Sequence, residues 1–389
     1  MAVYKLFPYK DTTVYSMYPS MNTGIDPILQ ISNLNFAMNT SPQVARAMLK
    51  FVDSEINSTL TNLVGNSSSW DAYLKLFIAT AQGIVESSTL EIYPVAVAAT
   101  TSSEWNNGTG TYLDQPLSED GACWESPYFG NGNSWAINTY DSNNIWMTGS
   151  WDATYSIPGG GAWYTSSQAD GSDSMLVSQT FDIRSAKDLN VNVTKIVQAW
   201  TSSALPNHGF IIKWEDGAEF NANKLVQPVM QYYSVDTNTI YPPQLEIRWD
   251  DFVWSTGSSG IEVLDQPNLK VSLAENPGTF FPSSINRFRL NVTQMYPPVT
   301  WVTQSAYTIQ HYLPSGSSWY AVKDLDTNEY VVEFDDTYTL ISADASSSYF
   351  DIYMNGLEPE RYYQILVKVT AGGSTTIYDN EYYFKVVNG

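Results

Sequence analysis

Hydrophobic and polar residues alternate along most of the chain, and this alternation predicts β-strands. It is cleanest at 244–249, 269–273 and 287–292, where every second side chain is hydrophobic. Successive side chains of a strand point to opposite faces of a sheet, so a period of two indicates strands with two distinct faces. Segments 74–78 and 89–95 are further strand candidates.

Three segments depart from simple alternation. Hydrophobic residues in 56–64 follow helical spacing, and 194–200 predicts a short helix. The segment 45–51 fits a helix by propensity, but it also fits a strand in which Ala47, Leu49 and Phe51 share one face. Periodicity alone leaves that choice open. Together these segments predict an all-β protein with a short helical insertion at 54–86.

The strand pattern divides the chain into two domains. A Gly- and Ser-rich stretch predicts a linker at 255–265, between a first domain at 1–254 and a second at 266–389. Many short strands with regularly spaced turns are typical of β-sandwiches, so we expect tandem sandwiches. In the second domain, 319–324 and 330–334 flank a polar turn and predict a hairpin. The Leu-x-Pro-x-x-x-Tyr pattern at 357–363 resembles the link before a late strand of immunoglobulin-like and fibronectin-type-III domains, where a tyrosine corner forms.

Composition narrows the classes of function. Aromatic residues make up 14% of the chain, charged residues only 15%, and the net charge is −22. So acidic a surface repels nucleic acid and anionic membranes, and we expect neither as a partner. Cys123 is the only cysteine, so a disulfide within the chain and a cysteine-based zinc site are excluded. The sequence has no secretory signal pattern and no apolar run long enough to span a membrane, so we expect no membrane insertion.

A series of motifs in the first domain resembles the DNRLRE family of β-sandwich domains. The similar segments occur in the family's order over about 240 residues: 11–24, 46–51, 90–93, 104–110, 151–161, 181–183, 193–200 and 207–212. The resemblance assigns 45–51 to a strand. It also implies a jelly-roll type sandwich, as in bacterial surface proteins and some carbohydrate-binding modules. Gly161 stands where the family often has Asp, which weakens any role of that loop in binding ions.

The architecture as a whole resembles a virion structural protein of a tailed, myovirus-like bacteriophage. This likeness implies assembly in the host cytoplasm and a place on the tail, neck, baseplate or capsid exterior. Its partners would be other virion proteins, in a homo-oligomer that docks on neighbouring subunits.

Few residues suggest catalysis. His208 and His311 lie in different predicted domains, and neither follows a nucleophile motif. Adjacent carboxylates are common in so acidic a chain and indicate solvated turns. The segment 324–328 has the Asp-x-Asp-x-Asn spacing of a calcium loop, but Glu329 occupies the position that needs glycine, which favours a hairpin turn. We therefore expect no enzymatic activity and no cofactor, with calcium as the one open alternative.

The Trp-rich loops between residues 100 and 165 are the best candidates for ligand contact. Exposed tryptophan faces stack on sugar rings, and neighbouring Asn and Asp side chains bind hydroxyl groups. The alternative is that these tryptophans pin long loops onto the sandwich, because Trp is usually buried. The candidate residues for contact with a glycan or a subunit are Trp105, Trp124, Trp135 and Trp146. The sequence thus predicts a virion structural and adhesion protein, with recognition of host envelope glycans as the alternative function.

Overall fold

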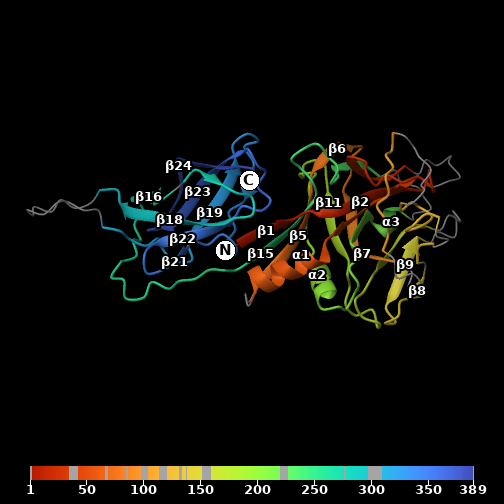
Figure 1. The fold of residues 1–389 in the computed structure, drawn as a ribbon, viewed down its shortest axis with the longest axis horizontal. Coiled ribbons are helices and arrows are strands. Elements are labelled where there is room, and N and C mark those ends of the chain that lie inside the picture. Colours follow the sequence, from red (N-terminus) through yellow and green to blue (C-terminus); the bar gives the residue numbers. More distant parts are fainter. Residues whose placement is uncertain are drawn as a thin grey trace, which may run out of the picture. The chain divides into compact units, whose positions relative to one another are not determined.

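The computed structural model is an all-β protein, as the alternating pattern predicts (Figure 1). Helix is confined to short segments in the described part of the chain. The structure describes residues 2–34, 43–65, 69–84, 86–97, 104–113, 121–130, 134–136, 138–150, 159–219, 227–275, 277–296 and 309–388. The 151–158 part of the motif that resembles the DNRLRE family lies outside these ranges.

The chain forms two compact units. The loop-rich unit comprises Leu6–Thr61 and Asp71–Glu246, and the C-terminal unit comprises Met1–Lys5, Asn62–Trp70 and Ile247–Gly389. The division falls within strand β15 (Gln244–Trp249), earlier than the linker expected at 255–265. The predicted limits, 1–254 and 266–389, stay a prediction from sequence.

The segment after β15 is fastened to the C-terminal unit by hydrogen bonds. Ala343 N donates to Val253 O at 2.9 Å, and Ser255 N donates to Ala343 O at 2.9 Å. Leu264 N donates to Tyr312 O, also at 2.9 Å. A Gly- and Ser-rich composition permits a free linker, but here backbone pairing holds much of it against neighbouring chain.

The loop-rich unit is built on one large sheet. Its strands run in the order β6-β14-β3-β4-β13-β7-β10-β9-β8, while β2 also pairs with β4 and β11 with β7. In the same unit β12 pairs antiparallel with β5, with Leu189 opposite Leu76. The strands up to the end of this unit are β1 (Ala2–Leu6), β2 (Pro8–Tyr15), β3 (Ile28–Asn33), β4 (Val44–Phe51), β5 (Trp70–Leu76), β6 (Ile78–Gln82), β7 (Ser88–Ala96), β8 (Thr139–Tyr140), β9 (Trp146–Ser150), β10 (Gly159–Tyr164), β11 (Val177–Phe181), β12 (Leu189–Asn192), β13 (Phe210–Trp214), β14 (Val229–Tyr233) and β15.

The segment 45–51 is a strand, which confirms the assignment made from the family resemblance. The opposite face of this strand, which carries Arg46 and Lys50, is not exposed to solvent. Every residue of β4 is buried, Arg46 and Lys50 included. Arg46 is 0% exposed because it pairs with Glu219 (Nε to Oε1, 2.8 Å) and lies about 5 Å from the Trp124 and Trp163 rings. The ion pair and the ring contacts take the place of the water that would otherwise solvate this buried guanidinium.

Short helices interrupt the strands, two of them at the segments 56–64 and 194–200 where sequence spacing predicted helix. α1 (Asp53–Ser58) continues into a π-helical turn, η1 (Thr59–Val64), so the insertion at 54–86 begins as helix and continues as strands β5 and β6. α2 (Thr194–Thr201) is the helix expected at 194–200, and α3 (Asp216–Glu219) is a single turn. α2 buries Ile196, Val197 and Trp200 on its inner face, as amphipathic spacing requires.

The C-terminal unit contains two sheets around one apolar core. One sheet has the order β16-β18-β22-β21, and the other β17-β24-β23-β19-β20. The hairpin predicted at 319–334 is β19 paired with β20. The strands are β16 (Leu269–Leu273), β17 (Thr279–Phe280), β18 (Ile285–Gln294), β19 (Ser318–Asp324), β20 (Tyr330–Val332), β21 (Ser342–Ala343), β22 (Ser348–Tyr353), β23 (Tyr362–Ala371) and β24 (Ser374–Val386).

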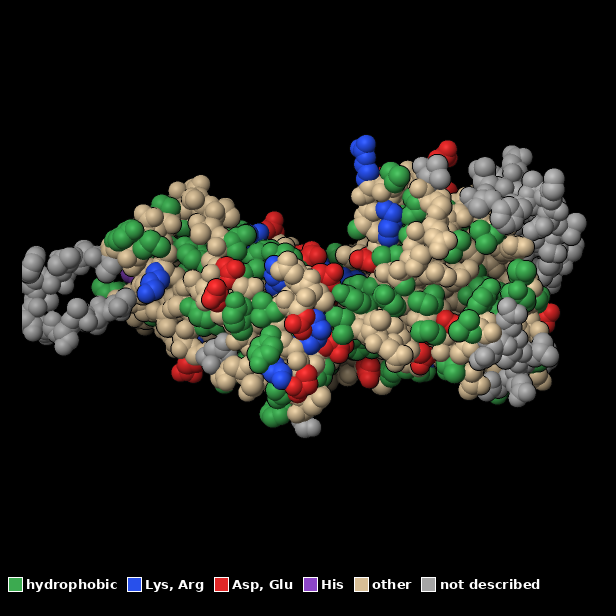
Figure 2. Space-filling view, turned by 90° about the horizontal axis from the view of Figure 1, so that it is seen from above, with side chains coloured by type: hydrophobic (Ala, Val, Ile, Leu, Met, Phe, Trp, Pro, Cys, Tyr) green, Lys and Arg blue, Asp and Glu red, His purple; other side chains and the backbone are tan. Residues whose placement is uncertain are grey.

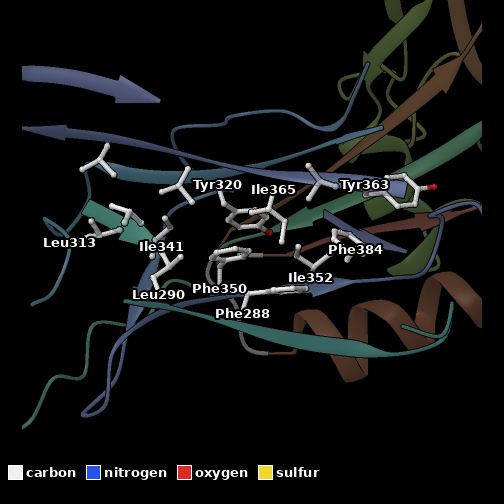
Figure 3. Packing of buried hydrophobic residues seen from close by; sticks show 14 of the residues in the cluster. Phe288, Leu290, Leu313, Tyr320, Ile341, Phe350, Ile352, Tyr363, Ile365 and Phe384 are labelled. Atoms are coloured by element: carbon white, nitrogen blue, oxygen red, sulfur yellow. The ribbon is translucent and has the colours of Figure 1, made fainter. Parts of the chain in front are cut away.

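Aromatic rings fill the space between these two sheets (Figure 3). Phe350 stacks on Tyr320 at 4.4 Å and on Phe288 at 5.6 Å between ring centroids, and Phe384 packs beside them. Tyr363 donates through its hydroxyl to the carbonyl of Glu358 at 3.1 Å. A tyrosine bonded to the backbone a few residues upstream is the corner that the 357–363 pattern predicted.

Candidate functional site

A cavity of about 550 Å³ opens in the loop-rich unit. It lies among α1, the turn after β8, the C-terminal end of α2 and the loop that leads to β13. Clefts of this size hold small ligands. Its walls are formed by Asp53, Ile56, Asn57, Val97, Asp141, Ser142, Asn143, Tyr164, Trp200, Thr201, Ser203, Leu205, Pro206, Asn207 and His208.

The buried part of the wall is apolar and aromatic. Tyr164 comes from β10 and Trp200 from the last turn of α2, and each is less than one-tenth exposed. Ile56 of α1 and Leu205 are also buried. The Trp200 ring is held by the Phe210 ring, 4.7 Å away between centroids. This side of the cavity is therefore built from firmly packed aromatic and aliphatic side chains.

The exposed part of the wall is polar and short-chained. Asn57, Ser142, Asn143 and Ser203 are all exposed and carry amide or hydroxyl groups. Such groups both donate and accept hydrogen bonds. An aromatic floor with a rim of amides and hydroxyls is complementary to a ligand that has apolar faces and many hydroxyl groups.

The turn that supplies part of the rim is preorganised. Asp141 Oδ1 accepts hydrogen bonds from Asn143 N at 2.8 Å and from Ile145 N at 2.9 Å. Asn144 adopts the left-handed backbone region at φ 61°, which Asn tolerates. The rim therefore pays little conformational entropy on binding a ligand.

A second group of residues holds the rim from the side of the loop before β13. Asn207 donates through its side-chain amide to Asp53 and accepts from Gly209 N at 2.9 Å. Ser203 ends α2 in the left-handed region at φ 60°, with its N donating to Trp200 O at 3.0 Å. The bond between Asn207 and Asp53 joins α1 to the loop after α2, and both residues line the cavity.

Two buried lysines, Lys10 and Lys50, lie behind this wall and bind the exposed carboxylate of Glu104. Lys10 donates to Glu104 at 3.0 Å and to Trp105 O at 2.6 Å, and Lys50 also donates to Glu104. Burial raises the pKa of Glu104, but the hydrogen bonds from Lys50 and Lys10 outweigh it and lower the pKa to about 2. Burial, with the charge of Lys50 next, lowers the pKa of His208 to about 4, so this wall residue is neutral at pH 7.

Two polar atoms of the cavity wall are buried without a hydrogen-bond partner among the described residues. They are Trp200 Nε1 and His208 Nδ1. Leaving such a group unpaired costs about 1–3 kcal/mol. Other buried ring nitrogens of the described residues, such as Trp163 Nε1 and Trp214 Nε1, share this state, so it does not by itself distinguish the cavity.

The four tryptophans predicted to contact a ligand lie elsewhere. Trp105, Trp124 and Trp135 are 1–2% exposed, Trp146 is half-buried, and none of them lines the cavity. Trp135 Nε1 donates to Cys123 O at 3.0 Å, and Trp124 O accepts from Gly160 N at 2.6 Å. These contacts match the alternative interpretation, in which tryptophans pin loops onto the sandwich. A contact with glycan or subunit through them stays a prediction.

Trp105 supports the cavity without lining it. Its Nε1 donates to the carbonyl of His208 at 2.7 Å, and Lys10 lies over its ring at 4.5 Å. The wall residues themselves were missed from sequence. Trp200 and the segment 207–209 stood in motifs of the family resemblance, but no sequence signal joins them to Asn57 or Asn143, which lie far away along the chain.

The described residues offer little support for a metal site. In those ranges no three His, Cys, Asp or Glu side chains gather as metal ligands. The segment 324–328 forms the turn between β19 and β20, as predicted, and Asp324 accepts from Arg361 at 2.7 and 2.8 Å. Both oxygens of that carboxylate are thereby engaged. None of the helices described here has the length and apolarity needed to cross a membrane.

No protein-family model matches the chain, and a search of curated proteins also finds no match. The likeness to DNRLRE domains and to virion proteins therefore rests on the motifs themselves.

Proposed function

We propose that the protein is a non-enzymatic adhesion protein whose loop-rich unit binds a glycan. The observation that carries this proposal is the cavity, with buried aromatic residues on one side and exposed amide and hydroxyl groups on the other. Sugars present both kinds of surface. The resemblance of the first domain to a family that includes carbohydrate-binding modules also implies glycan binding. The residues that line the cavity differ from the four tryptophans predicted from sequence.

Removing a rim amide tests this proposal. The probes are neutral oligosaccharides of glucan, galactan and mannan type, with binding measured by isothermal titration calorimetry. We expect Asn143→Ala to weaken binding about 5- to 10-fold, the loss of one ligand hydrogen bond. Asn190→Ala is the matched control, because Asn190 is exposed on β12 of the same unit and away from the cavity. Absence of binding by the unaltered protein, or equal affinity of Asn143→Ala, would refute the proposal.

A second candidate function is that of a virion structural subunit. The resemblance to tailed-phage proteins motivates it, and one feature of the C-terminal unit favours it. β24 spans thirteen residues, yet beyond its β23 neighbour the described strands pair with it only at Lys385 and Val386, through β17. An open strand edge can accept a strand from a neighbouring subunit. Incorporation into a particle, followed by electron microscopy of labelled protein, would distinguish this role.

A further inference from the structure

The charged groups of the cavity wall are all acidic. Asp53 and Asp141 line the cavity, and no Lys or Arg among the described residues does. Asp141 is engaged only by uncharged groups in the contacts found, namely the amides of Asn143 and Ile145 and the Tyr164 hydroxyl at 3.4 Å. A ligand that enters the cavity therefore meets negative charge without a compensating cation in the wall.

Two lysines behind the wall, Lys10 and Lys50, are already bound to a carboxylate of the protein. The side chains of Lys10 and Lys50 are only 8% and 2% exposed, and both bind Glu104. Lys50 also lies 3.7 Å from Asp53, so it offsets part of that charge from behind. Because these ammonium groups are enclosed, a ligand carboxylate cannot reach them to form an ion pair. His208, neutral at pH 7, adds no positive charge.

The remaining wall groups suit uncharged polar atoms. Asn57, Asn143 and Asn207 provide amides, while Ser142, Thr201 and Ser203 provide hydroxyls. Hydroxyl groups of a ligand can donate to the two wall carboxylates, an interaction that a ligand carboxylate cannot make when ionised. The same wall thus attracts uncharged glycans and repels acidic ones, and the difference between the two affinities is its specificity.

We infer that the cavity selects uncharged glycans and rejects acidic ones, such as those containing uronic or sialic acids. This inference rests on the proposed glycan-binding function. It concerns the class of ligand, which the sequence left unspecified.

Matched pairs of oligosaccharides test the inference. The probes are a glucan and a glucuronan fragment of equal length, and a galactan and a galacturonan fragment, with binding to the full chain measured by calorimetry at low salt. We expect each acidic probe to bind about ten-fold or more weakly than its neutral partner. In Asp141→Asn this ratio shrinks, because Asn keeps the oxygen that accepts from the turn amides but removes the charge.

Asp170→Asn is the control, since Asp170 is exposed in the same unit, lies outside the cavity and changes net charge equally. It should leave the ratio as in the unaltered protein. Circular dichroism confirms that each variant is folded. Equal or tighter binding of the acidic probes would overturn the selectivity while leaving glycan binding intact. Failure of all probes to bind would overturn the proposed function and this inference together.

Discussion

Two arginines, one in each unit, have the same kinds of partner, a carboxylate and an aromatic ring, but one is buried and the other is exposed. Arg46 of the loop-rich unit is 0% exposed and pairs with Glu219, between two tryptophan rings. The Arg287 side chain of the C-terminal unit is 45% exposed, pairs with Asp351 at 2.8 and 2.9 Å, and lies 3.9 Å from the Tyr349 ring. Each combines a carboxylate with an aromatic face, but only Arg46 has lost its water.

The difference reflects how each unit fills its interior. The C-terminal unit closes two sheets over stacked rings such as Tyr320 and Phe350, and the Arg287–Asp351 pair lies outside that apolar core. The loop-rich unit covers its central strand with loops, and their carbonyl groups need buried donors. Arg46 Nη1 donates to Gly160 O at 2.8 Å, where a glycine is required because a Cβ would lie 2.6 Å from the Trp124 ring.

The charges outside these interiors form no single patch on the face that Figure 2 shows. Acidic side chains are scattered over it, with Lys and Arg among them. The acidic side chains are therefore dispersed on that face. The two carboxylates of the cavity are distinguished by their placement and not by their number.

The largest effect is expected when the buried cation, Arg46, is removed. Arg46→Ala should lower the free energy of unfolding by about 3–5 kcal/mol, because it leaves Glu219 buried without its guanidinium partner. Urea unfolding followed by tryptophan fluorescence measures the loss. The double variant Arg46→Met with Glu219→Gln should recover part of it, since the buried carboxylate that lost its guanidinium partner is then also removed. A loss below about 1 kcal/mol would show that this buried ion pair resembles a surface pair.

A buried carboxyl of the same unit should make stability depend on pH. Asp11 is 1% exposed; burial raises its pKa to about 8, although the amide of Val235 donates to it at 2.7 Å. Because the folded pKa lies above the unfolded one, this contribution is full below about pH 4 and is lost as pH rises through about 8.

Asp11→Asn should remove that dependence. Relative to the unaltered protein, the free energy of unfolding of the variant should rise by about 3 kcal/mol between pH 5 and pH 7. This value follows from about 1.4 kcal/mol for each of the two pH units. Denaturant unfolding at both pH values measures the change. Asp170→Asn, exposed, serves as the control and should show no such trend. Parallel curves for Asp11→Asn and the unaltered protein would contradict the burial argument.

The smallest effect is expected at the exposed arginine. Arg287→Ala should cost about 0.2–1 kcal/mol, because solvent screens its pair with Asp351. The cost should shrink in 1 M salt, where the screening length is about 3 Å. Thermal unfolding at low and high salt checks this. A loss as large as that of Arg46→Ala, unchanged by salt, would erase the distinction between the two units.

Much of the strand pattern could be predicted from sequence, because the period of hydrophobicity carries it. Residues 244–249 and 269–273 are strands β15 and β16 with the predicted bounds. The tyrosine corner at 363 followed from a local motif. The burial of Lys50 could not be foreseen, because polar residues in an alternating strand normally mark a wet face, and only the covering loops exclude water.

The cavity shows the same limit. Trp124 and Trp135 were attractive candidates because Trp stacks on sugars, yet loops of this length bury their own tryptophans against the sheet. The side chains that do meet at the cavity are common Asn, Ser and Asp residues from segments such as 53–57, 141–143 and 200–208. In sequence these residues cannot be told from those of ordinary turns.

The amino-acid sequence by itself determined the local elements and the fold class, because side-chain alternation, turn residues and helix spacing act over a few neighbouring positions. The tertiary structure decided which polar residues lose water and which loops meet at a cavity. Those outcomes depend on contacts between segments distant along the chain, such as Arg46 with Glu219 and Asp53 with Asn207. No local pattern encodes such contacts.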